Sequence, residues 1–222
     1  MYYIKKLYDF LDRLAENNCR EWFAEHKQEY LDLRALWLED IDRLISAMTS
    51  WQPDLASQSA QTSAYRIYRD TRFKTDKTPY KTFFSALISP WGKKTDRAAY
   101  YIEIGRSQTY DQGLYAGAWC LDSPTLRKMR HAIVDNIEEW EEIVHSPAVT
   151  DNFRWCSSGL KTIPKGWERD HPQAHYLRMT NYGQFRECDD AFFLDPNWPE
   201  RAAELFHKLK PFVDFINYSI DE

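Results

Sequence analysis

The segment from Arg66 to Lys81 combines the residue types that could bind an anion. It reads RIYRDTRFKTDKTPYK and holds six cations, two acids and three aromatic rings. Guanidinium groups match the geometry of carboxylates and phosphates, and threonine hydroxyls can complete such a site. The segment therefore predicts a cationic, aromatic-lined pocket for a phosphorylated or carboxylated small molecule. Its anion-binding residues would be Arg66, Arg69, Arg72, Lys77 and Lys81.

A second interpretation of the same segment is a closed network of salt bridges. In an extended chain, Arg69 would share a face with Ile67 and Phe73, and a buried arginine needs a carboxylate or a bound anion as its partner. Asp70 and Asp76, together with acids from the helices, could supply that partner. The sequence leaves both interpretations open. By contrast, Lys93 lies in a predicted hairpin loop, where we expect it to be exposed.

Two further segments carry candidate groups for proton transfer. The turn-rich segment 160–172 contributes Lys165 as another cation, and its adjacent Asp170 and His171 could act as an acid/base pair. Asp170 could instead be a helix cap. His26 lies on the buried stripe of a predicted helix, where a hydrogen-bonded core histidine is the more common role. The candidate catalytic residues are therefore Asp70, His26 and His171.

Spacings typical of metal and cofactor sites are missing from the sequence. The four cysteines are Cys19, Cys120, Cys156 and Cys188, and no two form a CxxC pair. His171 and His175 are four residues apart, but Pro172 places His171 outside a helix. The chain has no GxGxxG, Walker A or GxSxG motif. We therefore predict no metal and no cofactor, and we leave open whether the protein is an enzyme.

The charge pattern suggests a second class of function. The net charge is −5, which disfavours a general nucleic-acid or membrane-surface binder. Residues 61–110 nevertheless carry 10 basic and 4 acidic residues. This basic region could be the contact face of a binding module for an acidic protein or a nucleic-acid backbone. Cations around a cavity would favour the small-molecule pocket, whereas cations on a convex face would favour the binding module.

Targeting and spanning signals are also missing. We find no apolar stretch that could serve as a signal peptide or cross a bilayer. The scattered cysteines fit a reducing compartment. We therefore predict a cytoplasmic protein without membrane contact, whose oligomeric state the sequence does not indicate.

Hydrophobic periodicity predicts an α+β fold in a single domain, residues 1–222. The short loops between the predicted strands indicate antiparallel pairing. A helix is predicted to start after Asp122, because Pro124 suits the first turn of a helix. The predicted fold is an antiparallel meander packed against long amphipathic helices from both chain ends. We expect helices over 4–14, 22–48, 122–144 and 199–220, and strands over 65–73, 83–88, 98–104, 110–119 and 182–186.

Three motifs together resemble a known family. They are NNxREWFxxHK from Asn17, RIYRDTRF and DKTPYK within 66–81, and the segment 160–172 with LKT, PKG and DHP. This combination is similar to the conserved-hypothetical family called domain of unknown function 2461, over nearly the whole chain. Lys74 departs from the small serine expected at its position. The resemblance implies no activity or cofactor, but it implies that the three segments meet in space. Because segments 66–81 and 160–172 are both rich in cations and turns, we also expect Lys165 to lie near Arg69.

Overall fold

The computed structural model describes residues 2–73, 75–106 and 111–221. The chain forms two compact units. Unit 1 consists of residues 1–93, 101–114 and 187–204, and unit 2 of residues 94–100, 115–186 and 205–222. We describe each unit by itself, and the single domain over 1–222 stays a prediction.

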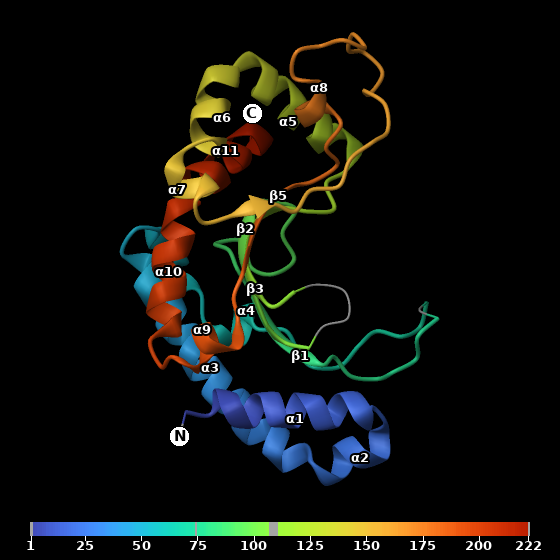
Figure 1. Cartoon of the computed structure of the whole chain (residues 1–222), viewed down its shortest axis with the longest axis vertical. Coiled ribbons are helices and arrows are strands. Elements are labelled where there is room, and N and C mark those ends of the chain that lie inside the picture. The colour runs from blue at the N-terminus through green and yellow to red at the C-terminus, as the bar shows by residue number, and fades with distance from the viewer. Residues whose placement is uncertain (1, 74, 107–110, 222) are drawn as a thin grey trace. The chain divides into compact units, whose positions relative to one another are not determined.

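Unit 1 is built mainly from the N-terminal helices and the first strand (Figure 1). Its elements are α1 (Ile4–Glu16), α2 (Arg20–Glu25), α3 (Lys27–Thr49), the 3-10 helix η1 (Pro53–Ser57), α4 (Ala60–Ser63), β1 (Phe83–Ile88) and α9 (Asp190–Leu194). Unit 2 contains α5 (Ser123–Asp135), α6 (Ile137–Val144), α7 (Pro147–Thr150), β4 (Arg154–Trp155), α8 (Ala174–Leu177) and α11 (Lys210–Asp221). Four elements contribute residues to both units: β2 (Ala99–Gly105), β3 (Gly113–Ala118), β5 (Tyr182–Glu187) and α10 (Trp198–Lys208).

The strands form an antiparallel sheet with the order β1-β2-β3-β5-β4. At one edge, β4 pairs with β5 so that Arg154 faces Phe185. The short connections between β1, β2 and β3 produce the predicted meander, because hairpins join antiparallel strands directly. The predicted α+β class is therefore confirmed, and so is a strand near 182–186.

The strand predicted over 65–73 is wrong. In place of a strand, isolated bridges pair Ala64 with Ala86 and Tyr68 with Tyr80. Two aspartates explain the irregular backbone. The Arg72 amide donates to the Asp70 carboxylate, and the Thr78 amide donates to the Asp76 carboxylate. Such local side-chain bonds compete with a regular ladder.

Three predicted long helices are each divided in two. The helix predicted over 22–48 breaks at His26, whose ring N–H donates to the Trp22 carbonyl at 2.8 Å. The one predicted over 122–144 breaks at Asn136, which caps the Ala132 carbonyl. The last breaks at Leu209, because Pro211 has no amide to continue the ladder.

Each unit has its own apolar core. In unit 1, α1 and α3 bury the predicted stripes, and the Trp37 ring packs against Phe84 and Trp198. In unit 2, the fully buried Trp140 is surrounded by aromatic rings, namely Tyr176, Tyr182, Phe212 and Phe215. In the part of the chain that the structure describes, no helix is both long and apolar enough to cross a membrane.

Candidate functional site

Residues 64–73 and 75–82 belong to an arm that leaves α4, projects from unit 1 and returns into β1 (Figure 1). The first signature segment holds the base of this arm. The Asn18 carboxamide accepts from the Tyr80 amide at 3.1 Å and donates to the Tyr80 carbonyl at 3.0 Å. The Phe23 ring stacks on Tyr80 with centroids 3.9 Å apart. The first two signature segments therefore do meet in space, as the resemblance implied.

At the outer end of the arm, the predicted anion-binding cations are paired within the arm itself. Arg69 donates to Asp76 at 2.6 Å and also to the Thr78 hydroxyl. The Arg69 side chain is 28% exposed, so the predicted burial beside Ile67 is only partial. Its pairing with Asp76 corresponds to the salt-bridge interpretation of the segment.

The other two outer cations also have local partners. Arg72 makes a bidentate pair with Asp70, and the hydrogen bonds from Arg72 lower the pKa of Asp70 to about 2. The Lys77 ammonium donates to the Thr71 carbonyl at 2.9 Å. Asp70, which we named as a candidate for proton transfer, is therefore an exposed and ionised carboxylate that pairs with Arg72.

The cations at the base of the arm are arranged differently. Arg66 and Lys81 lie here with two cations from outside the predicted set, Arg34 on α3 and Lys93 after β1. The Lys81 ammonium lies 4.9 Å from the centroid of the Tyr65 ring, and the Lys93 ammonium lies 5.7 Å from it. None of the four cations has a carboxylate within 4.0 Å among residues 2–73, 75–106 and 111–221. We call Arg34, Arg66, Lys81 and Lys93 the basal cation cluster.

A small cavity opens at this cluster. Its volume is about 10 Å³, close to the space that one water needs. Trp37 lines it, and the buried indole N–H of Trp37 has no hydrogen-bond partner within the described part of the chain. Cations and unpaired donors at one cavity are complementary to an anion. The full lining is Tyr30, Arg34, Trp37, Tyr65, Arg66, Ile67, Lys81, Phe83, Phe84 and Ser85.

Burial and mutual repulsion act on the two lysines of the cluster. Burial lowers the pKa of Lys81, and the charges of Arg66 and Lys93 lower it further, while Glu103 opposes the shift. Burial also lowers the pKa of Lys93, with Arg34 and Arg66 adding to the effect. Perturbed pKa values caused by burial and like charges are typical of functional sites. Lys93 is thus not the exposed loop residue that we predicted: its ammonium donates to the Ala64 carbonyl at 2.7 Å.

A buried acid lies on the neighbouring strand. Glu103 on β2 is 1% exposed, and its carboxylate accepts a 2.5 Å hydrogen bond from the Tyr101 hydroxyl. Its charge raises the pKa of Lys81, which shows that it acts electrostatically on the basal cluster. Glu103 is therefore a buried carboxylate whose charge opposes that of the basal cation cluster at Lys81.

The other histidine and lysine candidates lie elsewhere. In unit 1, the His26 ring stacks on Trp22, with centroids 3.9 Å apart, at the junction of α2 and α3. The segment 160–172 belongs to unit 2, where Lys165 is exposed. His171 accepts a hydrogen bond from the Gln173 amide, and α8 begins beyond Asp170, with Gln173 at its cap position. The contact of Lys165 with Arg69 and the meeting of all three segments stay predictions.

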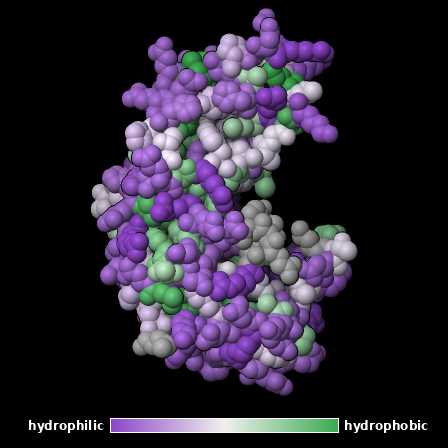
Figure 2. Space-filling model, in the orientation of Figure 1, coloured by the Kyte–Doolittle hydropathy of each residue, from purple (hydrophilic) through white to green (hydrophobic). Residues whose placement is uncertain are grey.

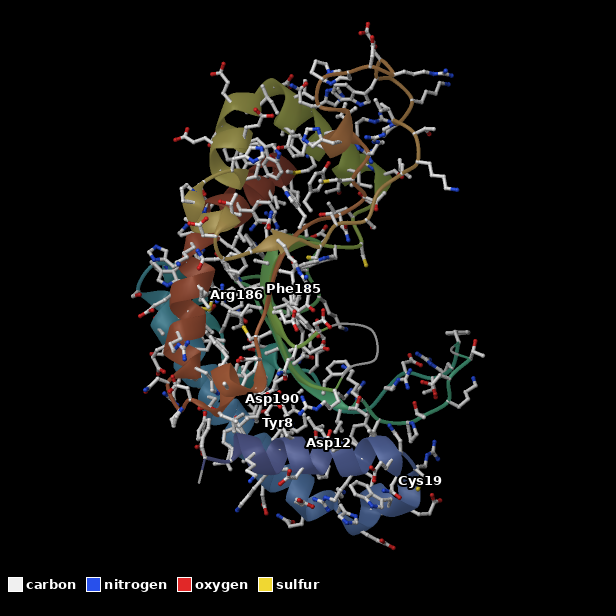
Figure 3. The ribbon with its side chains drawn as sticks, in the orientation of Figure 1. Tyr8, Asp12, Cys19, Phe185, Arg186 and Asp190 are labelled. Atoms are coloured by element: carbon white, nitrogen blue, oxygen red, sulfur yellow. The ribbon has the colours of Figure 1, made fainter. Side chains whose placement is uncertain are left out.

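A second polar cluster in unit 1 is fully paired. Arg106 makes a bidentate pair with Asp190 and lies 3.4 Å from Asp12, while Gln112 links Asp190 to the Tyr8 hydroxyl. Figure 3 shows Tyr8 and Asp12 along α1, with Asp190 nearby. One guanidinium thus faces two carboxylates, so this cluster stabilises the unit but has no excess cation to offer an anionic ligand.

No group of three or more His, Cys, Asp or Glu side chains within the described ranges could hold a metal ion. The basal cluster itself offers nitrogen donors that are cationic, which suits an anion and not a metal. Sequence reasoning found Arg66 and Lys81 but missed Arg34 and Lys93. Arg34 could have been found from its helical spacing, because that spacing places it beside Tyr30 and Trp37 on the same face of the helix.

The fold and the basal cluster define an α+β protein with a cationic cavity at the base of a projecting arm. The chain belongs to the family of conserved hypothetical proteins DUF2461, whose model matches residues 6–215. No curated protein and no solved structure matches the chain.

Proposed function

We propose that the protein binds a phosphorylated or carboxylated small molecule through the basal cation cluster. The supporting observation is that Arg34, Arg66 and Lys81 line one cavity without a carboxylate partner in the described ranges. Unneutralised cations near one another are unfavourable unless an anion joins them. Because the cavity is close to the size of one water, only one oxygen of the ligand's anionic group enters it, and the rest of that group stays at its mouth. Tyr65 and the other rings then contact the remainder of the ligand.

Phosphate is expected to stabilise the wild-type protein and to lose that effect in Arg66→Ala. A ligand that binds only the native state adds about 1.4 kcal/mol for each tenfold rise in its concentration above Kd. Urea unfolding at several phosphate concentrations, with ionic strength held constant by sodium chloride, measures this increment.

Arg72→Ala is the matched control for that experiment. Arg72 is an arginine of the same arm, but its side chain is 77% exposed and paired with Asp70. Arg72→Ala is expected to keep the full phosphate increment. Equal increments in all three proteins would show that phosphate acts as a general salt, and the proposed site would have to be abandoned.

One observation favours a second candidate function, contact with a nucleic-acid backbone or an acidic protein through the outer arm. Phe73 is 94% exposed, and the Arg72 guanidinium lies 5.9 Å from the centroid of its ring. An exposed ring among cations is the arrangement that single-stranded nucleic acid binds by stacking and phosphate contacts. Hydrophilic residues predominate on the face shown in Figure 2, which argues against a large apolar interface there.

Under this second function, Phe73→Ala is expected to weaken binding of a fluorescent single-stranded oligonucleotide by about 1–3 kcal/mol, the contribution of one stacked base. Its stability in urea should change by less than about 0.5 kcal/mol, because the ring is exposed. Leu31→Ala, which removes a 43% exposed apolar side chain from α3, is the control. Fluorescence anisotropy at two salt concentrations measures the binding, and the same titration with an acidic peptide identifies the other partner class. If Phe73→Ala and Leu31→Ala bind both probes as the wild type does, the outer arm is not the contact surface.

A further inference from the structure

Lys81 has surroundings that differ from those of a lysine that only pairs with anions. Its ammonium lies 4.9 Å from the centroid of the Tyr65 ring and 5.5 Å from that of the Phe83 ring. Its side chain is half-buried at the cavity, so the amine can reach a bound ligand. Lysines that are desolvated among apolar groups and set beside other cations are activated as amine nucleophiles.

The charges around Lys81 come from four segments of unit 1. Arg66 on the arm and Lys93 after β1 disfavour its protonated form, and Glu103 on β2 favours that form. Arg34 on α3 lines the same cavity. Burial is the largest influence and acts in the same direction as the two cations, so the neutral amine is more populated than in an exposed lysine.

We propose that Lys81 is an amine nucleophile that forms an imine with an aldehyde or ketone carrying a carboxylate or phosphate group. The inference rests on the proposed function, because Arg34 and Arg66 hold the anionic end of the ligand at the cavity that Lys81 lines. Lys93 does not take this role, since its ammonium is engaged by the Ala64 carbonyl.

The chemistry is a condensation that needs no further reactant. The Lys81 ammonium loses a proton to water, and the nitrogen lone pair adds to the carbonyl carbon while the C=O π bond opens. A proton passes from nitrogen to that oxygen through water and gives a neutral carbinolamine. The second N–H proton then passes to the hydroxyl group, the C–O bond breaks, water leaves, and a C=N bond joins the Nζ atom to the former carbonyl carbon. Neither partner is oxidised or reduced.

Glyoxylate with borohydride tests the proposal, because glyoxylate places an aldehyde next to a carboxylate and borohydride reduces the imine to a stable carboxymethyl amine. Peptide mapping by mass spectrometry then reports the labelling of each lysine in the wild-type protein. Labelling at Lys81 is expected to exceed that at the exposed Lys77 by about tenfold. This is a small part of the rate increase that results when a reactant is held beside the group it reacts with. Phosphate should suppress the Lys81 label alone, and acetaldehyde, which lacks the anionic group, should not show the preference. Equal labelling of Lys81 and Lys77 by glyoxylate would overturn the inference.

The phosphate increment of the wild-type protein in urea unfolding separates this inference from the proposed function. Lys81→Arg has no primary amine at position 81, so it is the blank for the Lys81 label. If phosphate stabilises the wild-type protein and Lys81 is not labelled, imine formation is wrong while anion binding stands. If Lys81 is labelled selectively but phosphate neither stabilises the protein nor competes, the assignment of the basal cation cluster as the anion site is wrong, and the inference falls with it.

Discussion

Gly117→Ala is expected to prevent unit 2 from folding. Gly117 on β3 has φ +142°, a conformation that residues with a side chain rarely adopt. A Cβ atom there would lie 2.0 Å from the Tyr182 carbonyl oxygen and 2.8 Å from the Gly183 Cα atom, both on the adjacent strand β5. Because both obstacles are backbone atoms, the clash is relieved only by separating the two strands.

The expected cost exceeds about 4 kcal/mol, which is a large part of the 5–15 kcal/mol that stabilises a typical domain. Circular dichroism and urea unfolding of the purified variant would measure it. Gly166→Ala is the matched control, since Gly166 also has a positive φ of +103° but has nothing within 4 Å of the added atom. That substitution should cost only about 1–2 kcal/mol, from the backbone conformation alone. Similar unfolding midpoints for the two variants would contradict the close approach of β3 and β5.

Asp40→Ala is expected to destabilise unit 1 by about 3–5 kcal/mol, the usual cost of removing one member of a buried charged network. The Asp40 carboxylate is 5% exposed and accepts hydrogen bonds from the Tyr3 hydroxyl at 2.8 Å and from the Trp198 indole at 3.2 Å. It also accepts from the Tyr2 hydroxyl and pairs with Arg43 at 2.9 Å. Alanine would remove the acceptor of the two tyrosine hydroxyls, and the Tyr3 hydroxyl lies in the protein interior. The Trp198 indole would keep the Tyr2 hydroxyl as an acceptor, and Arg43 would keep Glu200.

Urea unfolding measures this effect directly. Glu39→Ala removes the neighbouring carboxylate on α3, which is exposed, so it should change the free energy of unfolding by less than about 0.5 kcal/mol. Asp40→Asn keeps one acceptor oxygen and is expected to fall between the two. If Asp40→Ala unfolds at the same urea concentration as Glu39→Ala, the network around Asp40 contributes no stability and our account of this core is wrong.

The arm shows why one stretch of sequence supported two opposed interpretations. Its outer cations follow the salt-bridge interpretation, because Asp70 and Asp76 lie close enough in sequence to pair with Arg72 and Arg69 across tight turns. Its basal cations, Arg66 and Lys81, lie at the two ends of the segment and form no ion pair with those aspartates. Cations occur along the whole arm. The distance of each cation from the two aspartates in the folded arm therefore determines whether it remains available to a ligand.

The sequence by itself determined the elements that depend on local periodicity and local caps. The apolar stripes of α1 and α3 are where the spacing predicted them, and Asp122 caps the amide of Thr125 at the start of α5. These features follow from side chains three or four residues apart, which meet within one helix whatever the rest of the chain does. The α+β class follows from the same local patterns.

Only the tertiary structure decided the contacts between distant residues. The Asn18 carboxamide binds the backbone of Tyr80, 62 residues away, a contact that nothing in its local sequence indicates. Lys93 was predicted to be exposed, but it packs beside Tyr65 and joins Arg34, Arg66 and Lys81. A carboxamide or an ammonium can bind any backbone group that the fold brings within reach, so residue type and spacing do not specify the partner.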